Sequence, residues 1–281
     1  MRIVTTADEF RAASRAARRS GARLGFVPTM GALHEGHLSL VRTAKARCDV
    51  VAASIFVNPT QFGPTEDFAK YPRNFERDCE LLNKEAVELL FAPTAEEMYP
   101  AGAATWVEVQ GISDRLCGRS RPGHFRGVTT VVAKLFHIVE PDVALFGQKD
   151  AAQLAILRRM VRDLKIGVEI VACPIVREAD GLAMSSRNAY LDAAQRKQAL
   201  VLHRALNTVR DLFERGERGA RVLEDAGKRV VAAEPGGRLD YLEIVDPETL
   251  EGVAVVRGPA LVAVAAFVGS TRLIDNVVLG G

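Results

Sequence analysis

Residues 24–37 read LGFVPTMGALHEGH, and their pattern indicates the fold of the first part of the chain. Its first four residues, 24–27, are apolar without a break, as in a strand that is covered on both faces. A glycine-rich turn follows, and from Leu40 to Cys48 apolar residues recur with the spacing of one helix face. A buried strand, a turn and an amphipathic helix in this order form the first half of a βαβ unit.

The same alternation continues through the first two-thirds of the chain. The apolar runs that we interpret as buried strands are residues 24–27, 50–57, 87–91, 143–146 and 168–172. Amphipathic helical patterns lie between them, and an arginine-rich run over 11–23 is interpreted as the solvated face of a first helix. Strand–helix alternation implies right-handed crossovers. The sequence therefore predicts an α/β fold with a Rossmann-like, doubly wound parallel sheet.

The pattern changes after Cys173 and Pro174. A long helical pattern covers 193–213, and a charged helix near 220–232 follows it. The expected strands 239–245, 260–268 and 272–279 then complete a smaller α+β unit. We therefore predict two domains, residues 1–174 and residues 175–281.

Composition limits the possible functions. Of the 281 residues, 48% are hydrophobic and 26% are charged, which is typical of a globular protein. The formal net charge of +2 argues against a dedicated nucleic-acid binder, although a local basic pocket for a small anion is compatible with it. No signal peptide is visible, and the longest apolar run, 259–268, is far shorter than a membrane span. We expect a soluble, cytoplasmic protein with no membrane or nucleic-acid partner.

Cysteine and histidine spacing argues against a metal centre built from side chains. The four cysteines form no C-x-x-C pair, so buried free thiols are expected. His34 and His37 are three residues apart, which differs from the H-E-x-x-H spacing of zinc proteases. The remaining histidines offer no recognisable third-ligand spacing.

Ligands of doubly wound sheets bind in the loops that follow the strands, here the loops after Val27, Val57 and Phe146. In the first loop, Gly31 and Gly36 have P-loop spacing, but His37 stands where a P-loop has lysine. Two imidazoles and a glycine-rich turn at the positive end of a helix suit phosphate oxygens. A helix cap with one surface histidine is the alternative.

The other loops leave more than one interpretation open. Gln61, in the loop after Val57, offers both an acceptor and a donor to a polar substrate. After Phe146, Lys149 could supply a point charge for phosphate, or it could be a solvated lysine beside a helix capped by Asp150. Further along, 184–188 is either a phosphate clamp or a serine-rich turn. The basic loop 118–127 is either a solvated turn or a lid.

These motifs resemble those of a known family. The segment PTMGALHEGH from Pro28 is similar to the HIGH-type motif of nucleotidylyltransferases and class I aminoacyl-tRNA synthetases. The segment MSSR from Met184 resembles a KMSKS-type counterpart. The closer resemblance is to the pantothenate synthetase (pantoate–β-alanine ligase) family. It is carried by FVNPTQF from Phe56, YPR from Tyr71, RPGHFRGV from Arg121, FGQKD from Phe146, DGLAMSSRN from Asp180 and DYLEIVDP from Asp240.

The resemblance implies a ligase that uses ATP and Mg²⁺ to condense (R)-pantoate with β-alanine. The pantoate carboxylate attacks the α-phosphate, pyrophosphate leaves, and the amine then attacks the pantoyl adenylate to give pantothenate and AMP. It also implies a homodimer, an ATP- and pantoate-binding N-terminal domain and a C-terminal lid domain. The alternatives are another nucleotidylyltransferase of the same superfamily and a nucleotide-binding sensor without activity.

The resemblance also implies a set of site residues. His34, His37, Lys149 and Arg187 would compensate phosphate charge, and His37 would also act as a general acid. Gln61 and Gln153 would hold pantoate, with Gln61 also near β-alanine. Asp78 would be an indirect ligand of magnesium, whose protein ligands are otherwise unknown. Gln148 departs from the glutamate common in the family. The implied ATP-binding residues are Met30, Gly31, Ala32, Leu33, His34, Glu35, Gly36, His37, Gly147, Gln148, Lys149, Asp150, Val176 through its backbone, Met184, Ser185, Ser186 and Arg187.

Overall fold

The computed structural model describes residues 1–19 and 21–280, and its internal contacts divide the chain into two compact units. The first unit comprises residues 1–113, 121–147 and 156–174. The second comprises residues 114–120, 148–155 and 175–281. The longest stretch of the second unit thus begins directly after residue 174. The sequence patterns did not indicate that the segments 114–120 and 148–155 group with it.

A six-stranded sheet forms the centre of the first unit. Its strands pair in the order β1-β4-β3-β2-β5-β6, and every pairing is parallel. The strands are β1 Arg2–Val4, β2 Leu24–Thr29, β3 Val50–Ile55, β4 Leu89–Phe91, β5 Val143–Gly147 and β6 Glu169–Cys173. The predicted parallel, doubly wound sheet is confirmed. Strand β1 was not predicted, because it has three residues and only Val4 is buried.

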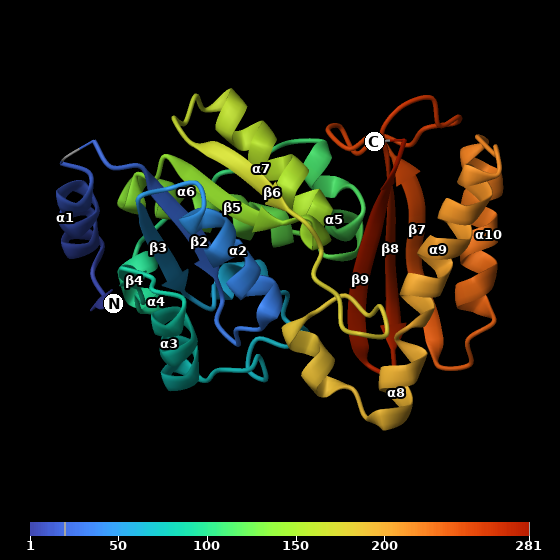
Figure 1. The fold of residues 1–281 in the computed structure, drawn as a ribbon, viewed down its shortest axis with the longest axis horizontal. Coiled ribbons are helices and arrows are strands. Elements are labelled where there is room, and N and C mark those ends of the chain that lie inside the picture. The colour runs from blue at the N-terminus through green and yellow to red at the C-terminus, as the bar shows by residue number, and fades with distance from the viewer. Residues whose placement is uncertain (20, 281) are drawn as a thin grey trace. The chain divides into compact units, whose positions relative to one another are not determined.

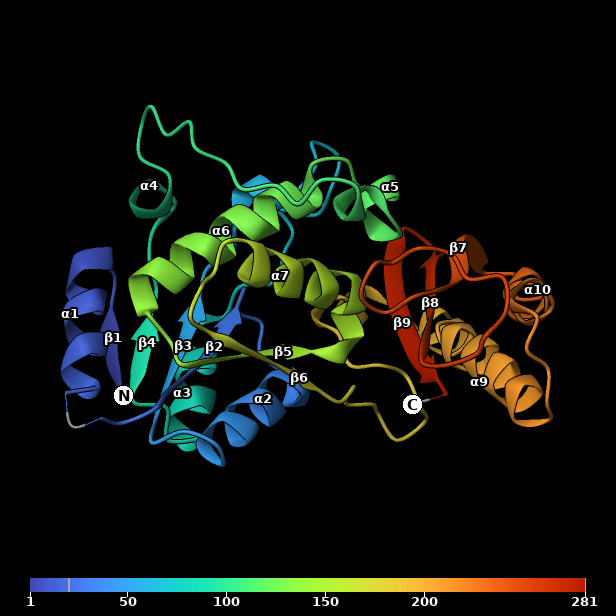
Figure 2. The same ribbon diagram turned by 90° about the horizontal axis from the view of Figure 1, so that it is seen from above.

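Helices cover both faces of this sheet. Figure 2 shows α6 on one face and α2 and α3 on the other. The helices that lie wholly or partly in this unit are α1 Ala7–Ala17, α2 Glu35–Lys45, α3 Phe75–Lys84, α4 Ala95–Met98, α6 His124–Val139 and α7 Ala151–Asp163, with the 3₁₀ turns η1 Pro59–Gln61 and η2 Ile112–Asp114. Because both faces are covered, the central strands are apolar except for the buried Thr29 and Ser54, much as their sequences indicated.

The direction of winding reverses between β2 and β5. These two strands are neighbours, with Gly25 opposite Val143, although β3 and β4 lie between them along the chain. In doubly wound folds, ligands bind beside the carboxyl ends of the strands at such a reversal. The segments that follow β2 and β5 are therefore the ones that the topology selects for a ligand.

The second unit contains an antiparallel sheet of three strands, β7 Gly237–Val245, β8 Ala260–Val268 and β9 Thr271–Leu279. Helices α9 Val201–Glu214 and α10 Ala220–Ala232 pack on it (Figure 1). The unit also contains α5 Cys117–Ser120, α8 Ala193–Gln198 and the 3₁₀ turns η3 Gln148–Asp150 and η4 Ser186–Tyr190. The predicted α+β organisation is confirmed.

One predicted helix was wrong in its extent. The pattern over 193–213 predicted a continuous helix, but the structure has α8 and α9 with an interruption at Ala199 and Leu200. The amides of Leu200 and Leu202 each bond to the carbonyl three residues earlier, 3.3 Å away, rather than four. This tighter winding ends the α-helical ladder for one turn, and apolar periodicity alone does not reveal it.

All four cysteines are free, as predicted, but only Cys117 and Cys173 are buried, whereas Cys48 and Cys79 are half-buried. Within residues 1–19 and 21–280, no helix combines the length and the apolar character needed to cross a bilayer.

Adjacent residues of α10 test how the second unit is stabilised. Leu223 is fully buried against the three-stranded sheet, whereas Val222 is 51% exposed. Replacing Leu223 with alanine leaves a cavity, so we expect a loss of about 2–5 kcal/mol in the free energy of unfolding of this unit. Val222→Ala should change it by less than about 0.5 kcal/mol. Urea unfolding of both variants checks this, and equal losses would contradict it.

Candidate nucleotide site

The turn after β2 is fixed by a buried carboxylate from another element. Gly31 and Ala32 both have positive φ, +78° and +51°, which brings successive backbone N–H groups to one side. The Asp78 carboxylate on α3, 1% exposed, accepts the N–H of Ala32 through Oδ2 and that of Leu33 through Oδ1, both at 2.8 Å. A Cβ at Gly31 would lie 3.0 Å from Asp78 Oδ2, so the close approach favours glycine. Both oxygens of Asp78 are thus committed to holding the turn.

The two histidines cap helix α2. His34 Nδ1 accepts from the N–H of Gly36 at 3.1 Å, and His37 Nδ1 accepts from the N–H of His34 at 3.3 Å. Their ring centroids are 4.2 Å apart. A ring nitrogen that accepts carries no proton, so each neutral imidazole bears its proton on Nε2. The two histidines can therefore cap α2 through Nδ1 and still donate to an anion through Nε2–H, so the helix-cap and phosphate-binding interpretations are compatible.

Asn58 organises the turn that follows β3. Its side chain is 1% exposed, and its Oδ1 accepts from the hydroxyls of Thr60 and Tyr99, both at 2.9 Å. Its Nδ2 donates to Gln61 Oε1 at 3.0 Å and to the Gly127 carbonyl at 3.2 Å. The amide of Gln61 is oriented in this way, with its Nε2 3.2 Å from the sulfur of Met30. Gln61 therefore lies beside the first residue of the glycine-rich turn.

The N-terminal turn of α6 packs tightly on the same segment. A Cβ at Gly127 would lie 2.3 Å from the carbonyl oxygen of Thr60, so only glycine fits there. His124 Nδ1 is 2.8 Å from the Gln61 carbonyl, and its Nε2 is 2.9 Å from Arg121 Nη1. A carbonyl only accepts and a guanidinium only donates, so His124 is the neutral tautomer with its proton on Nδ1.

Arg121 in this loop forms an ion pair with Glu66, with N–O distances of 2.7 Å. Burial opposes ionisation of Glu66, but the hydrogen bonds and charge of Arg121 outweigh it and hold the pKa of that carboxyl below its ordinary value. The basic loop 118–127, whose function the sequence left open, is thus neutralised in part by this pair.

The second unit contains the cationic loops. Lys149 lies partly buried in η3, and burial lowers its pKa below the ordinary value for a lysine. The negative charges of Asp150 and Asp275 oppose this shift, and the positive charge of Arg187 adds to it. Backbone carbonyls of η3 are held by Asn276 of β9, whose Nδ2 lies 2.9 Å from the carbonyl oxygens of Gln148 and Lys149.

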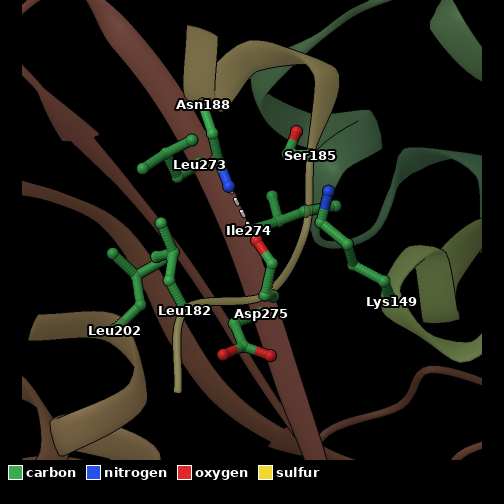
Figure 3. A pocket seen from close by; sticks show the side chains of 9 residues that line it. Lys149, Leu182, Ser185, Asn188, Leu202, Leu273, Ile274 and Asp275 are labelled. Carbon is green, nitrogen blue, oxygen red and sulfur yellow. Dashed lines mark hydrogen bonds between the residues drawn. The ribbon is translucent and has the colours of Figure 1, made fainter. Parts of the chain in front are cut away.

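A short hairpin leads into the segment 184–187. Arg177 and Ala183 form an antiparallel bridge, and the N–H of Met184 donates to the Val176 carbonyl at 3.0 Å. Ser185 then caps η4, its Oγ accepting the N–H of Arg187 at 3.3 Å. Figure 3 shows the small cavity at this point, with Lys149 and Ser185 on its wall. The residues that line it are Lys149, Leu182, Ala183, Ser185, Asn188, Leu202, Leu273, Ile274 and Asp275.

The predicted site residues therefore fall into two sets. Within the first unit the structure brings Gln61 next to the turn at 30–37. Within the second it brings Lys149 near Ser185, while the Arg187 charge acts on Lys149. Gln153 lies half-buried on α7, and Asp150 is exposed. The first set is Met30, Gly31, Ala32, Leu33, His34, Glu35, Gly36, His37, Gln61 and Gly147; the second is Gln148, Lys149, Asp150, Gln153, Val176, Met184, Ser185, Ser186 and Arg187.

Sequence reasoning missed residues that hold these groups in place. Asn58 and His124 lie within the quoted blocks FVNPTQF and RPGHFRGV, but neither was given a role. Asp275 and Asn276 were interpreted only as part of a strand. The sequence did contain a signal for Asp275 and Asn276, because these two consecutive polar residues interrupt the otherwise apolar run LIDNVVL.

The arrangement suits an anion. Among residues 1–19 and 21–280, no group of three His, Cys, Asp or Glu side chains could hold a metal ion. The start of helix α2 and the cations Lys149 and Arg187 are instead groups of the kind that bind phosphate. Fold and site together define the class: an α/β enzyme that binds a nucleotide.

Comparison with known proteins specifies the family. The model of the pantoate-beta-alanine ligase family matches residues 2–278. The pantothenate synthetase of Acidobacterium capsulatum is 65% identical, with 100% of this chain and 97% of that protein covered. That of Thermotoga neapolitana is 58% identical, with 100% of both covered.

Solved structures agree. A crystal structure of pantothenate synthetase from Thermus thermophilus is 50% identical, with a TM-score of 0.93 over 99% of both chains. That of the pantoate-beta-alanine ligase from Francisella tularensis, complexed with beta-gamma ATP and beta-alanine, is 33% identical, with a TM-score of 0.77 over 99% of this chain and 97% of that one. The chain belongs to the pantoate-beta-alanine ligase family.

The close approach of Gly127 to the Thr60 carbonyl generates a test. Gly127→Ala forces a methyl group against backbone, so we expect a loss of about 1–3 kcal/mol in stability and a displaced Gln61. Gly167→Ala, in the same unit, meets no atom within 4 Å and should be tolerated. Thermal melting and a crystal structure of Gly127→Ala measure the two effects, and an undisturbed 58–61 turn would contradict the packing argument.

Proposed function

We propose that this chain condenses pantoate with β-alanine at the expense of ATP, releasing pyrophosphate, AMP and pantothenate through a pantoyl adenylate. The observation that carries the proposal is the pair of phosphate-suited residue sets, one in each unit, in a chain that belongs to the ligase family along its whole length. Adenylation is chemically required because a free carboxylate has no leaving group for an amine to displace.

In the first unit, the N-terminus of α2 binds phosphate oxygens of ATP. The helix dipole provides fixed partial positive charge there. His34 and His37 donate from Nε2, because the cap uses Nδ1 as the acceptor. Their contribution to rate is electrostatic, aimed at charge that develops around the α-phosphorus as pantoate attacks.

In the second unit, Lys149 and Arg187 neutralise the departing pyrophosphate. Lys149 provides a compact charge, and Arg187 can bind two oxygens of one phosphate. Ser185 and Ser186 add hydroxyl donors beside them. We propose that the remaining predicted residues complete the contacts of ATP.

Gln61 and Gln153 bind pantoate in this proposal. The Oε1 of Gln61 already accepts from Asn58, so its amide nitrogen is the group that can donate to a pantoate oxygen. In this orientation Gln61 donates to hydrogen-bond acceptors, such as the carboxylate and hydroxyl oxygens of pantoate. In this proposal Gln61 also contacts β-alanine after adenylation.

Magnesium fits the site as an ion carried by the phosphates. Mg²⁺ commonly keeps several waters and binds substrate phosphates together with one or two carboxylates. When bound, it would neutralise charge on the triphosphate. Both oxygens of Asp78 accept backbone N–H groups, so this carboxylate supports the turn rather than binding the metal directly. A homodimer and a cytoplasmic location are further proposals that rest on the family resemblance.

The deciding experiment follows two products. ATP with pantoate should yield pyrophosphate, and adding β-alanine should then yield AMP and pantothenate. Turnover indifferent to β-alanine would favour another nucleotidylyltransferase. ATP binding without pyrophosphate release would favour a sensor.

Lys149 should be required in its protonated form. We expect Lys149→Ala to lower pyrophosphate release by about 10²-fold or more. Because burial lowers the pKa of Lys149, the wild-type kcat/KM for ATP should decline with rising pH below the range of an ordinary lysine, about 10.4. Lys149→Arg stays charged, so its rate should lack this decline. Unchanged pyrophosphate release in Lys149→Ala would remove Lys149 from the mechanism.

His37 can be tested as a hydrogen-bond donor without proton transfer. Glutamine offers an N–H near the position of the imidazole Nε2 but cannot act as a general acid at neutral pH. His37→Gln should therefore retain about tenfold more adenylation activity than His37→Ala, the value of one hydrogen bond to a charged group. Equal losses in the two variants would instead support proton donation by His37.

A further inference from the structure

Two consecutive polar side chains lie buried in the apolar strand β9. Asp275 and Asn276 are each 3% exposed. Burying a carboxylate and an amide costs free energy unless both are hydrogen-bonded. The hydrogen-bond partners of Asp275 and Asn276 therefore indicate the structural role of these two buried side chains.

Asp275 holds the hairpin before the segment 184–187. Its two oxygens accept from the guanidinium of Arg177, Oδ2 at 2.6 Å and Oδ1 at 2.9 Å. The same guanidinium donates to the carbonyl of Gly181 at 3.0 Å, which closes the hairpin on itself. A bidentate pair of this kind fixes direction as well as distance. The segment that follows the hairpin therefore starts from a point fixed by β9.

Asn276 holds the other cationic loop. Its Nδ2 donates to the carbonyls of Gln148 and Lys149, both at 2.9 Å, and its Oδ1 lies 3.4 Å from Gln148 Nε2. Both carbonyls belong to η3, the turn that presents the Lys149 side chain. Asn276 thus fixes the backbone from which the ammonium group extends.

We propose that Asp275 and Asn276 are positioning residues for adenylation, which set the Lys149 loop and the segment 184–187 in register on one rigid strand. Figure 3 shows the result, with Lys149, Ser185 and Asp275 around one cavity. The inference rests on the proposed function, because it assigns these loops to the triphosphate. Catalysis by fixed charges depends on their placement, which remote packing residues can control.

Asp275 also acts on Lys149 through charge. The charged groups around the ammonium are Asp150, Asp275 and Arg187, and Asp275 is one of the two that favour the protonated amine. Removing the Asp275 charge therefore lowers the pKa of Lys149 further. A purely structural carboxylate would have no such effect.

A double-mutant cycle tests the proposal in the full chain, with kcat/KM for ATP measured from pyrophosphate release with pantoate alone. Asp275→Asn and Asn276→Ala should each lower it at least tenfold. In a Lys149→Ala background Asn276→Ala should lower it less than threefold, because Asn276 acts through the Lys149 loop. In Asp275→Asn, the decline of kcat/KM at alkaline pH should also move to lower pH. In Asp275→Glu, the decline should return to its wild-type pH range.

Asp240→Asn is the matched control. Asp240 is another partly buried carboxylate of the same sheet, paired with Arg272 at 2.7 Å and 3.0 Å. Its loss should lower the melting temperature without moving the pH profile.

The outcomes separate the two proposals. Equal losses from Asn276→Ala with and without Lys149, or folded variants with wild-type kcat/KM, would overturn the positioning role. If Asp275→Asn does not fold, the Asn276→Ala cycle decides in the same way. A wild-type protein that releases no pyrophosphate would instead refute the proposed function, and this inference with it.

Discussion

The site in the first unit depends on one buried carboxylate that accepts two backbone N–H groups. Asp78 comes from α3, forty-five residues beyond Leu33, yet it sets the turn from which α2 and its histidines begin. A turn with two positive φ values is costly for Ala32, so it persists because a neighbouring element specifies it. The start of α2 and its histidine cap are therefore held in place before any ligand arrives, and pre-organised groups act without reorganisation during a reaction.

In each unit, support comes from a segment remote in sequence. Asn58 and Gly127 bring the start of α6 onto the turn that carries Gln61, and β9 does the same for the loop of Lys149. The cost of burying these polar groups is offset because each one is hydrogen-bonded. Loops that bear charge would otherwise be mobile, so these buried amides and carboxylates convert flexible connections into fixed ones.

The sequence predicted the order of strands and helices well, because covered parallel strands are continuously apolar and α10 has a clear apolar face. The prediction failed where apolar periodicity carries no information. Strand β1 is too short to show a pattern, and the tightened turn at Leu200 interrupts the helix without interrupting its apolar periodicity. For the candidate site, motif residues such as His37 and Lys149 were proposed from their chemistry. Asn58 and Asn276 were not, because a supporting amide is recognisable only when its distant partner is known.

The histidine cap of α2 links two processes that seem unrelated. Each Nδ1 serves as an acceptor for a backbone N–H, so an imidazolium, which carries hydrogen on both nitrogens, would present a donor to a donor. Protonation of the rings therefore removes the acceptors that support the first turn of the helix, so the charge of the rings and the start of α2 are linked.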